Sequence, residues 1–329
     1  MRAVILAGGG GTRLRPLTNT TPKPMLEFMG RPYAIGLLRR LADVGVDHLD
    51  LLVGQATDAF APLVEAGRGL GVAVDVLTEE RPLDTAGAAR RLLRGAGEAD
   101  VIVCNGDVLT DLDYADLVKH HREAGAVATI ALTRVEDTSS FGVIERDDDG
   151  RIRAFIEKPP PGTTDVDTVN AGTYVLDAAA FDPFPGDGPL SFERDVFPGL
   201  LRAGALLRGV AYDVHWQDLG TPQRFRDGHR AVLERRCAWP VPAALEWRAD
   251  GVAVHRTATV DADATLIAPV VVGPGATVGR DALLAGAIVL AGVRIGDGAT
   301  VTDSIVGPGT RIAGGVEVGP RAVLVADGV

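Results

Sequence analysis

Residues 6–25 read LAGGGGTRLRPLTNTTPKPM, and this stretch decides the fold of the first two-thirds of the chain. It continues an apolar run, residues 3–6, which predicts a buried first strand. Because glycine has no Cβ, the four glycines can take positive φ and close their N–H groups on an anion. Arg13 adds a planar cation suited to phosphate oxygens, and Lys23 adds an ammonium held between two prolines. The stretch therefore predicts a phosphate-binding loop with two cations.

This loop differs from the two commonest phosphate-binding motifs. A Walker loop places Lys and then Ser or Thr directly after its last glycine, whereas Gly11 precedes Thr12 and Arg13. A dinucleotide-binding G-x-G-x-x-G opens a helix at once, whereas here prolines predict a long ordered loop first. The glycines alone fit a tight turn at the end of a strand equally well, so only the longer string favours phosphate.

Composition and charge limit the class of protein. The chain has 329 residues and a net charge of −11, which argues against nucleic acid or an anionic membrane as the main partner. No apolar run approaches the roughly 20 residues of a membrane span, and no leader sequence is evident. The two cysteines, Cys104 and Cys237, give neither a disulfide framework nor metal-ligand spacing. We expect a cytoplasmic protein of one or two domains.

Strand and helix patterns alternate through the first two-thirds of the chain. Such alternation predicts a largely parallel sheet with helices on both faces, whose ligands bind at the carboxyl ends of the strands. The expected strands are His48–Val53, Val72–Leu77, Val101–Cys104, Ala126–Leu132, a hairpin of Gly142–Glu145 and Arg151–Glu157, and Val169–Leu176. The expected helices are Tyr33–Val44, Asp58–Ala66, Ala86–Arg94, Tyr114–Glu123, Phe192–Leu201 and Pro222–Arg235.

A six-residue period replaces this alternation in the last quarter of the chain. Aliphatic residues recur at 254, 260, 266, 272, 278 and 284, then at 289, 295 and 301, and then at 306, 312, 318 and 324. The intervals are small and turn-rich, which predicts a parallel β-helix whose aliphatic side chains stack inward. A β-sandwich with irregular strands is the alternative, but it rarely keeps one period for so long. We expect a domain at 1–236, a linker at 237–250 and the β-helix at 251–329.

Two aspartates follow apolar strands, and the first lies at a place suited to a metal. Asp107 ends VIVCNGD (101–107), and Asp218 lies in VHWQDLGTP (214–222). A carboxylate at the carboxyl end of a strand and beside a phosphate loop, as at Asp107, can hold Mg²⁺ through oxygen. The alternatives are structural, because Asp107 could cap the next loop and Asp218 could support a turn before a helix capped by Thr221.

The string G-G-x-G-T-R-L-x-P-L-T-x-x-x-P-K-P resembles the signature of the sugar-1-phosphate nucleotidyltransferases, the NDP-sugar pyrophosphorylases. Five further segments resemble that family: PLDTAG (82–87), FGV (141–143), EKP (157–159), NAG (170–172) and WQDLGTP (216–222), whose aspartate is the second metal ligand in the family. Asp84 departs from the pattern, because many members have glycine there, and this departure bears on the loop conformation and the base preference. The mannose-1-phosphate guanylyltransferase branch is the most similar. The resemblance implies a Rossmann-like nucleotidyltransferase domain with a mixed, mainly parallel sheet, followed by a left-handed β-helix.

The resemblance also implies the reaction and its residues. An NTP and a sugar 1-phosphate would give an NDP-sugar and pyrophosphate, with Mg²⁺ on Asp107 and Asp218 and with Arg13 and Lys23 as catalytic cations. The nucleotide would contact two groups of residues: Leu6, Ala7, Gly8, Gly9, Gly10, Gly11 and Thr12, and then Glu79, Thr85, Ala86 and Gly87. The sugar phosphate would contact Gly142, Glu157, Lys158 and Asn170.

Several alternatives remain open at this point. The favoured substrates are GTP and mannose 1-phosphate or a related hexose or heptose 1-phosphate, and a glucose-1-phosphate thymidylyltransferase activity is the alternative. A non-catalytic regulatory homologue that binds NDP-sugar is a second alternative, although the joint presence of the predicted cations and carboxylates argues against it. An acyltransferase β-helix is a third, but its repeats offer only His255 as a base. We expect residues 251–329 to form a homo-oligomer through an apolar final coil, and not to take part in catalysis.

Overall fold

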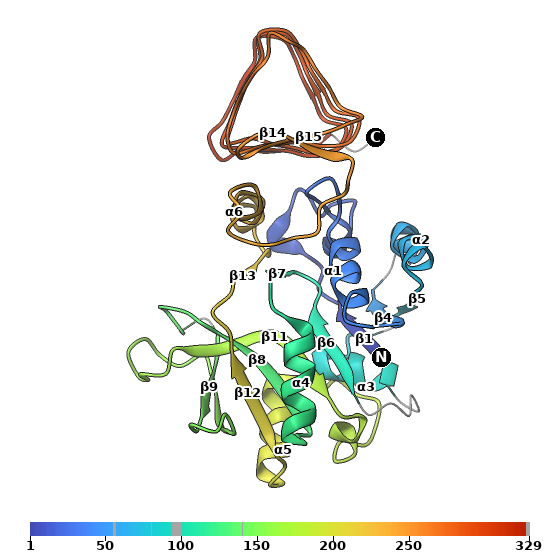
Figure 1. Ribbon diagram of the computed structural model, residues 1–329, viewed down its shortest axis with the longest axis vertical. Helices are drawn as coiled ribbons and strands as arrows, with labels where there is room; N and C mark the ends of the chain where they lie inside the picture. The colour runs from blue at the N-terminus through green and yellow to red at the C-terminus, as the bar shows by residue number, and fades with distance from the viewer. Residues whose placement is uncertain (55–56, 80, 94–99, 140, 327–329) are drawn as a thin grey trace. The chain divides into compact units, whose positions relative to one another are not determined.

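Two compact units make up the chain. Figure 1 shows the computed structural model, which describes residues 1–54, 57–79, 81–93, 100–139 and 141–326. Unit 1 contains Met1–Gly9, Leu38–Val108 and Leu112–Trp216; unit 2 contains Gly10–Leu37, Leu109–Asp111 and Gln217–Val329. The glycine loop is therefore divided between them, and both predicted cations belong to the same unit as the C-terminal part of the chain. Among the described residues, no helix has the length and apolar character needed to cross a membrane.

Unit 1 is an α/β unit built on a nine-stranded mixed sheet. The strand order is β10-β9-β11-β6-β1-β4-β5, with β8 pairing β11 and β12. Strands β6, β1, β4 and β5 are mutually parallel, while β11 runs antiparallel to β6 and β8. The strands are β1 (Arg2–Leu6), β4 (His48–Val53), β5 (Ala73–Thr78), β6 (Val101–Asn105), β8 (Ala128–Arg134), β9 (Gly142–Arg146), β10 (Ile152–Glu157), β11 (Thr168–Leu176) and β12 (Leu207–Ala211). This arrangement confirms the predicted Rossmann-like class.

The helices cover this sheet as the sequence pattern predicts. They are α1 (Tyr33–Ala42), whose first turn belongs to unit 2, α2 (Ala61–Leu70), α3 (Asp84–Leu93), α4 (Tyr114–Ala124) and α5 (Phe197–Arg202). Helix α3 packs against β1 and β4, and α4 packs against β8 and β12. Helix α4 begins at Asp113, which accepts the N–H groups of Ala115 and Asp116, and it ends at Gly125 with φ +59. The buried residues of β1 and β6 are fully apolar, so the sheet is the core of the unit.

Unit 2 ends in a three-sided parallel β-helix, seen end-on as a triangle in Figure 1. Successive coils pair at intervals of 17 or 18 residues, as in Val252↔Val270 and Val271↔Ile288. One face holds β15 (Val252–His255), β18 (Val270–Val272), β21 (Ile288–Val289), β24 (Ile305–Val306) and β27 (Val323–Leu324). The second holds β16 (Thr259–Val260), β19 (Thr277–Val278), β22 (Arg294–Ile295) and β25 (Arg311–Ile312), and the third holds β17 (Thr265–Ile267), β20 (Leu283–Ala285), β23 (Thr300–Thr302) and β26 (Glu317–Val318). The predicted β-helix is confirmed.

The two breaks in the six-residue period have one structural cause. Leu284 is followed by Val289 and Val301 by Val306, and both steps pass from the third face to the first. Each deletion therefore removes a residue from the same corner and shortens that coil to 17 residues, as the register Ile288↔Ile305 shows. The aliphatic side chain of each hexad still faces the interior, where Val272, Leu284 and Val289 are fully buried.

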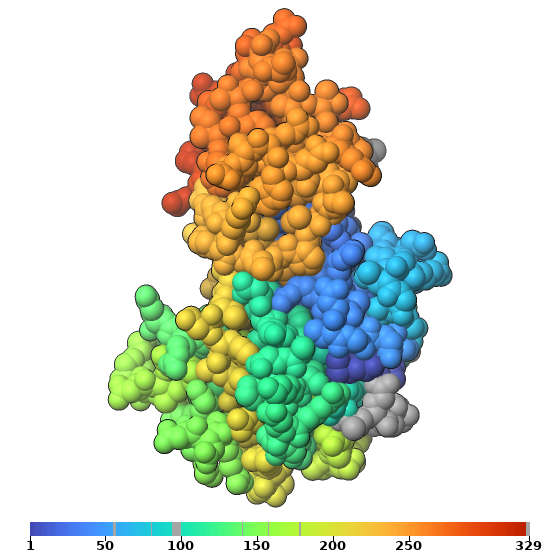
Figure 2. Space-filling model, viewed as in Figure 1, coloured from blue at the N-terminus to red at the C-terminus, as the bar shows by residue number. Residues whose placement is uncertain are grey.

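The segment between α6 (Pro222–Leu233) and the β-helix, expected as a linker, has structure of its own. Its strand β14 (Leu245–Ala249) pairs antiparallel with β15 and extends the first face of the β-helix. Trp239 is buried and stacks on Tyr33, with ring centroids 4.8 Å apart. In the space-filling view the segment runs without a gap into the first coil (Figure 2). Strands β7 (Val108–Thr110) and β13 (Trp216–Asp218) form a separate two-stranded sheet.

Candidate active site

Unit 2 brings three predicted site residues together. The Lys23 Nζ lies 3.9 Å from Asp218 Oδ1. A Cβ added at Gly220 would lie 2.6 Å from Asp218 Oδ1 and 3.2 Å from Arg13 Nη2. Arg224, which the sequence reasoning missed, donates to Asp218 Oδ2 at 2.9 Å. Two cationic side chains therefore pair with one carboxylate, and Arg13 lies on the other side of the space that Gly220 leaves open.

Local backbone geometry explains how the loop presents these cations. Gly11 has φ +59, a value that favours glycine, and its carbonyl accepts the Thr18 hydroxyl at 2.8 Å. A Cβ at Gly11 would approach Lys23 Cβ to 3.4 Å, so the stem of Lys23 packs against the loop. The short 3₁₀ turns Thr12–Leu14 and Lys23–Met25 carry Arg13 and Lys23. Pro22 and Pro24 fix the second turn by restricting the backbone on each side of Lys23.

Asp218 has the chemistry of a ligand for a hard cation. Its Oδ2 accepts from Arg224, whereas its Oδ1 is buried and accepts no hydrogen bond from the residues that the structure describes. A buried carboxylate oxygen with unused lone pairs is uncommon in proteins, and such an oxygen is a preferred ligand of Mg²⁺. Thr221 caps α6 by accepting the Arg224 N–H at 3.2 Å. The segment that contains Asp218 therefore also leads into a capped helix, as its structural alternative predicts.

The second predicted carboxylate lies in unit 1, at the edge of the sheet where the glycine loop begins. Strands β1 and β6 are parallel with Leu6 opposite Asn105. The Gly106 N–H donates to the Leu6 carbonyl at 3.0 Å, which fixes the chain just before Asp107. Asp107 is half-buried. Its carboxylate, like that of Asp218, suits Mg²⁺, and the two aspartates belong to different units.

Glu79, predicted to contact the nucleobase, follows β5 in unit 1. Its Oε1 accepts the Leu83 N–H at 2.5 Å, and a Cβ at Gly8 would lie 3.4 Å from its Oε2. Glu79 therefore packs against the first glycine and orders the start of the 82–87 loop. The N–H groups of Ala86 and Gly87 both donate to the Leu190 carbonyl at 2.9 Å, so they serve to anchor this loop.

Asp84 takes the conformation that glycine would take at this position. Its φ is +59, in the left-handed region where Asp is better tolerated than most residues. Its Oδ1 accepts the Thr85 N–H at 2.7 Å, and its Oδ2 is paired with Arg194. These contacts hold the loop in the conformation that a glycine adopts without side-chain help. The loop therefore accommodates an aspartate at the position where many family members have glycine.

The predicted sugar-phosphate residues lie on β9, β10 and β11 of unit 1. Val169 is opposite Val143, which places Asn170 beside the start of β9 at Gly142. The Asn170 side chain accepts the Gly172 N–H and donates to the Tyr174 hydroxyl, both at 2.8 Å. The Lys158 N–H donates to the Phe141 carbonyl at 3.1 Å, and the Lys158 side chain is exposed.

Of Glu157, which is predicted to bind the sugar, the structure describes only the backbone. Glu157 pairs with Gly142 through its backbone in β10, but its side chain lies outside the described residues. Its predicted contact with sugar hydroxyls stays a prediction.

Glu193 links the 82–87 loop to β11 and was not predicted. It accepts the hydroxyls of Tyr174 at 3.2 Å and Ser191 at 2.9 Å, and the Thr85 hydroxyl lies 3.4 Å away. Through Tyr174 this network reaches Asn170. Glu193 lies in a π-helical turn, Phe192–Val196, and such turns are frequent at functional sites. Sequence periodicity cannot reveal this turn, because it interrupts an otherwise regular helical pattern.

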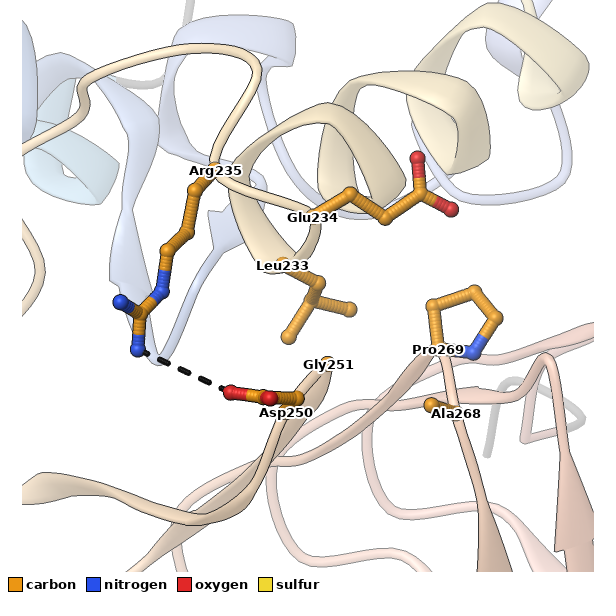
Figure 3. Close-up of a pocket in the computed structure, with 7 residues that line it drawn as sticks. All are labelled: Leu233, Glu234, Arg235, Asp250, Gly251, Ala268 and Pro269. Carbon is orange, nitrogen blue, oxygen red and sulfur yellow. Dashed lines mark ion pairs between the residues drawn. The ribbon is translucent and has the colours of Figure 1, made fainter.

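Two further features lie apart from these residues. A cavity of about 460 Å³ in unit 2 is lined by Leu233, Glu234, Arg235, Asp250, Gly251, Ala268 and Pro269 (Figure 3). Arg235 and Asp250 form an ion pair of 4.0 Å at its rim, and no predicted site residue lines it. In unit 1, His48, Asp50 and Asp75 present atoms within 4.8 Å of one another. Arg2 already donates to both Asp50 oxygens, at 2.5 and 3.0 Å, so a guanidinium occupies that cluster.

Comparisons with known proteins agree with this geometry. The family model described as nucleotidyl transferase matches residues 2–235, and the model described as GMPPB C-terminal domain matches residues 249–329. A mannose-1-phosphate guanylyltransferase of Mycobacterium tuberculosis is 40% identical over 287 residues, covering 87% of this chain and 79% of that protein. The mannose-1-phosphate guanyltransferase beta-B of Xenopus laevis is 35% identical over 239 residues, covering 71% of this chain and 65% of that protein.

A solved structure is similar as well. It is HddC from Yersinia pseudotuberculosis complexed with GMP-PN, which is 28% identical with a TM-score of 0.59. The similarity covers 70% of this chain and 99% of that one.

Proposed function

This chain belongs to the nucleotidyl transferase family, and from that premise we propose that it is an enzyme that joins GTP and mannose 1-phosphate. The products are GDP-mannose and pyrophosphate. The observation that carries the proposal is the Arg13–Lys23–Asp218 cluster, because it combines phosphate-binding cations with a buried carboxylate oxygen suited to a metal. The guanine and mannose assignments are supported by the named activities of the relatives and by the guanine nucleotide in the HddC complex.

The chemistry requires positioning and charge stabilisation more than a protein nucleophile. A phosphate oxygen of the sugar 1-phosphate forms a bond to the α-phosphorus, and the bond from that phosphorus to pyrophosphate breaks. Arg13 and the glycine-loop N–H groups bind the β- and γ-phosphates, and Lys23 stabilises charge that develops at the α-phosphate. Mg²⁺, when bound by Asp107 and Asp218, supplies further neutralisation of phosphate charge. Lys158 binds the attacking phosphate.

The remaining assignments complete the proposal. Glu79 and Thr85 order the loop that contacts the nucleobase, because Glu79 accepts the Leu83 N–H and the Thr85 hydroxyl accepts the Phe192 N–H. Asn170 orients the sugar through its link to Tyr174. We also propose a cytoplasmic location and the domain division at residues 236 and 251. We further propose a homo-oligomer formed through the apolar final coil of the β-helix, where Val316 is 41% exposed.

A substrate panel tests the activity. Purified protein with Mg²⁺ is given GTP, dTTP, ATP or UTP with mannose, glucose or heptose 1-phosphate, and pyrophosphate release is measured. We expect the highest kcat/KM with GTP and mannose 1-phosphate. Preference for dTTP and glucose 1-phosphate would replace the guanylyltransferase assignment. Tight GDP-mannose binding by a folded protein with no turnover on any pair would favour a regulatory homologue.

A further inference from the structure

A short hairpin connects the Lys23 turn to the C-terminal part of unit 2. The signature hairpin consists of β2 (Glu27–Phe28), the turn Met29–Gly30 and β3 (Arg31–Pro32). The Leu26 N–H donates to the Lys23 carbonyl at 3.2 Å, and the Tyr33 N–H donates to the Leu26 carbonyl at 2.9 Å. Because the hairpin closes directly on the turn that carries Lys23, a shift of the hairpin moves the Lys23 backbone.

The Glu27 side chain fastens this hairpin to the β-helix. Its Oε2 accepts the Ala291 N–H at 2.7 Å, across 264 positions of sequence. A Cβ added at Gly273 would lie only 2.5 Å from Glu27 Oε1. Glycine at 273 therefore leaves the space that the carboxyl group fills, between two successive coils. Leu17 of the same loop packs nearby, because a Cβ at Gly307 in the next coil would lie 3.5 Å from its Cδ2.

Ala291 differs from its neighbours in the coils before and after it. Stacked turns join the first face to the second, and the residue of the next coil is 17 positions along: Pro274, Ala291 and Pro308. Hydrogen bonds confirm the stacking, since the Gly292 N–H donates to the Pro274 carbonyl and the Gly309 N–H to the Ala291 carbonyl. Proline has no N–H, so of these three equivalent positions only Ala291 can donate to Glu27.

A second contact holds the hairpin from helix α6. Met29 has φ +52, which is uncommon for a residue other than glycine, and its side chain is fully buried. Its N–H donates to His229 Nε2 at 3.3 Å, while His229 Nδ1 lies 3.0 Å from the Phe225 carbonyl and donates to it. Burial lowers the pKa of His229 to about 4, so the ring is neutral and Nε2 accepts. The hairpin is therefore held by α6 on one side and by the β-helix on the other.

We propose that Glu27 is a positioning residue for catalysis, through which the β-helix fixes the Lys23 turn against Asp218. The inference rests on the proposed catalytic role of Lys23. It gives the β-helix a part in the reaction and replaces the expectation that residues 251–329 only assemble the protein. Glu27 reaches no substrate in this role. It acts by holding Lys23 Nζ at its observed position, 3.9 Å from Asp218 Oδ1.

Four variants separate positioning from simple stability. Glu27→Ala removes the acceptor, and Ala291→Pro removes the donor with a residue that the equivalent turns already carry. We expect each to lower kcat about 10-fold with GTP and mannose 1-phosphate, on the order expected for a misplaced catalytic group. The KM for the sugar phosphate should not change, because its predicted ligands lie in unit 1. The matched controls Glu27→Gln and Ala291→Ser keep acceptor and donor and should retain wild-type kcat.

A double-mutant cycle and lysine labelling complete the test. If Ala291→Pro acts through Glu27, it adds no further loss in the Glu27→Ala background. The chain has only three lysines, and Lys23 is 12% exposed whereas Lys119 is 67% exposed, so Lys119 is an internal reference for amine acylation read by mass spectrometry. We expect Lys23 labelling to rise several-fold in Glu27→Ala and Ala291→Pro and to stay unchanged in both controls.

The labelling result is independent of turnover. If wild-type protein is inactive but the labelling changes as expected, the positioning inference stands and the proposed function fails. If the wild type is active and Glu27→Ala keeps both wild-type kcat and wild-type Lys23 labelling, the inference is overturned.

Discussion

The charge state of Glu27 predicts a pH-dependent difference in stability. Burial raises the pKa of Glu27 to about 7 from its usual 4.5, and the hydrogen bond from the Ala291 N–H opposes this by lowering it. A raised pKa means that folding favours the neutral acid. Its contribution to stability is fully present below pH 4.5 and is lost as the pH rises through 7. At about 1.4 kcal/mol per pKa unit, the wild type loses at most about 3 kcal/mol from this group.

Glu27→Gln isolates this contribution, because glutamine resembles the neutral acid and does not titrate. We expect the difference in melting temperature from the wild type to be smallest near pH 5 and to reach several degrees in favour of the variant at pH 9, at about 2–4 °C per kcal/mol. Melting curves of both proteins from pH 5 to pH 9 measure the difference, in which the titration of other groups cancels. Glu317→Gln, at an exposed position of the β-helix, is the control and should show no pH-dependent difference. A difference between Glu27→Gln and wild type that does not change with pH would refute the burial of Glu27 against the β-helix.

Three further variants test the site. Asp218→Asn should lower kcat on the order of 100-fold with an unchanged melting profile. The control Asp263→Asn, at an exposed position, should keep its activity. Equal activity of the two variants would contradict the metal assignment. Lys158→Ala should chiefly raise the KM for mannose 1-phosphate, since it binds that group in ground and transition states alike, and a weakened GTP affinity instead would show the assignment to be wrong. Asp84→Gly should change the free energy of unfolding by less than about 1 kcal/mol, because relief of the left-handed backbone offsets the loss of the Thr85 and Arg194 contacts. Its GTP to dTTP ratio of kcat/KM should match wild type, and a changed ratio would mean that Asp84 itself reads the base.

Local periodicity was sufficient to predict most of the fold. The strand at His48–Val53 and the hexads from Val254 follow from patterns that each segment carries by itself. The one-residue deletions in the hexads were visible as well, and the structure adds that both fall at one corner of the β-helix. Strand β12 was missed because it is short and has Gly209 at its centre, which weakens a strand pattern.

Contacts between distant segments could not be predicted in this way. The partner of Glu27 is the backbone N–H of a residue 264 positions away. Because every residue except proline has a backbone N–H, the residue type at position 291 does not reveal this hydrogen bond. Pro274, Ala291 and Pro308 are visible in the sequence, but only the register between the coils shows that they occupy equivalent positions. The backbone conformation of Asp84 could not be predicted either. The sequence revealed the departure from glycine, but not that the aspartate has a left-handed φ.

Oxygen labelling of the products tests the central claim most directly. Mannose 1-phosphate with ¹⁸O at its three non-bridging phosphate oxygens is reacted with unlabelled GTP and Mg²⁺, and the products are weighed by mass spectrometry. Direct attack of the sugar phosphate on the α-phosphorus predicts that GDP-mannose keeps all three labels and that pyrophosphate carries none. Labelled pyrophosphate, or the absence of GDP-mannose with folded wild-type protein, would contradict the account.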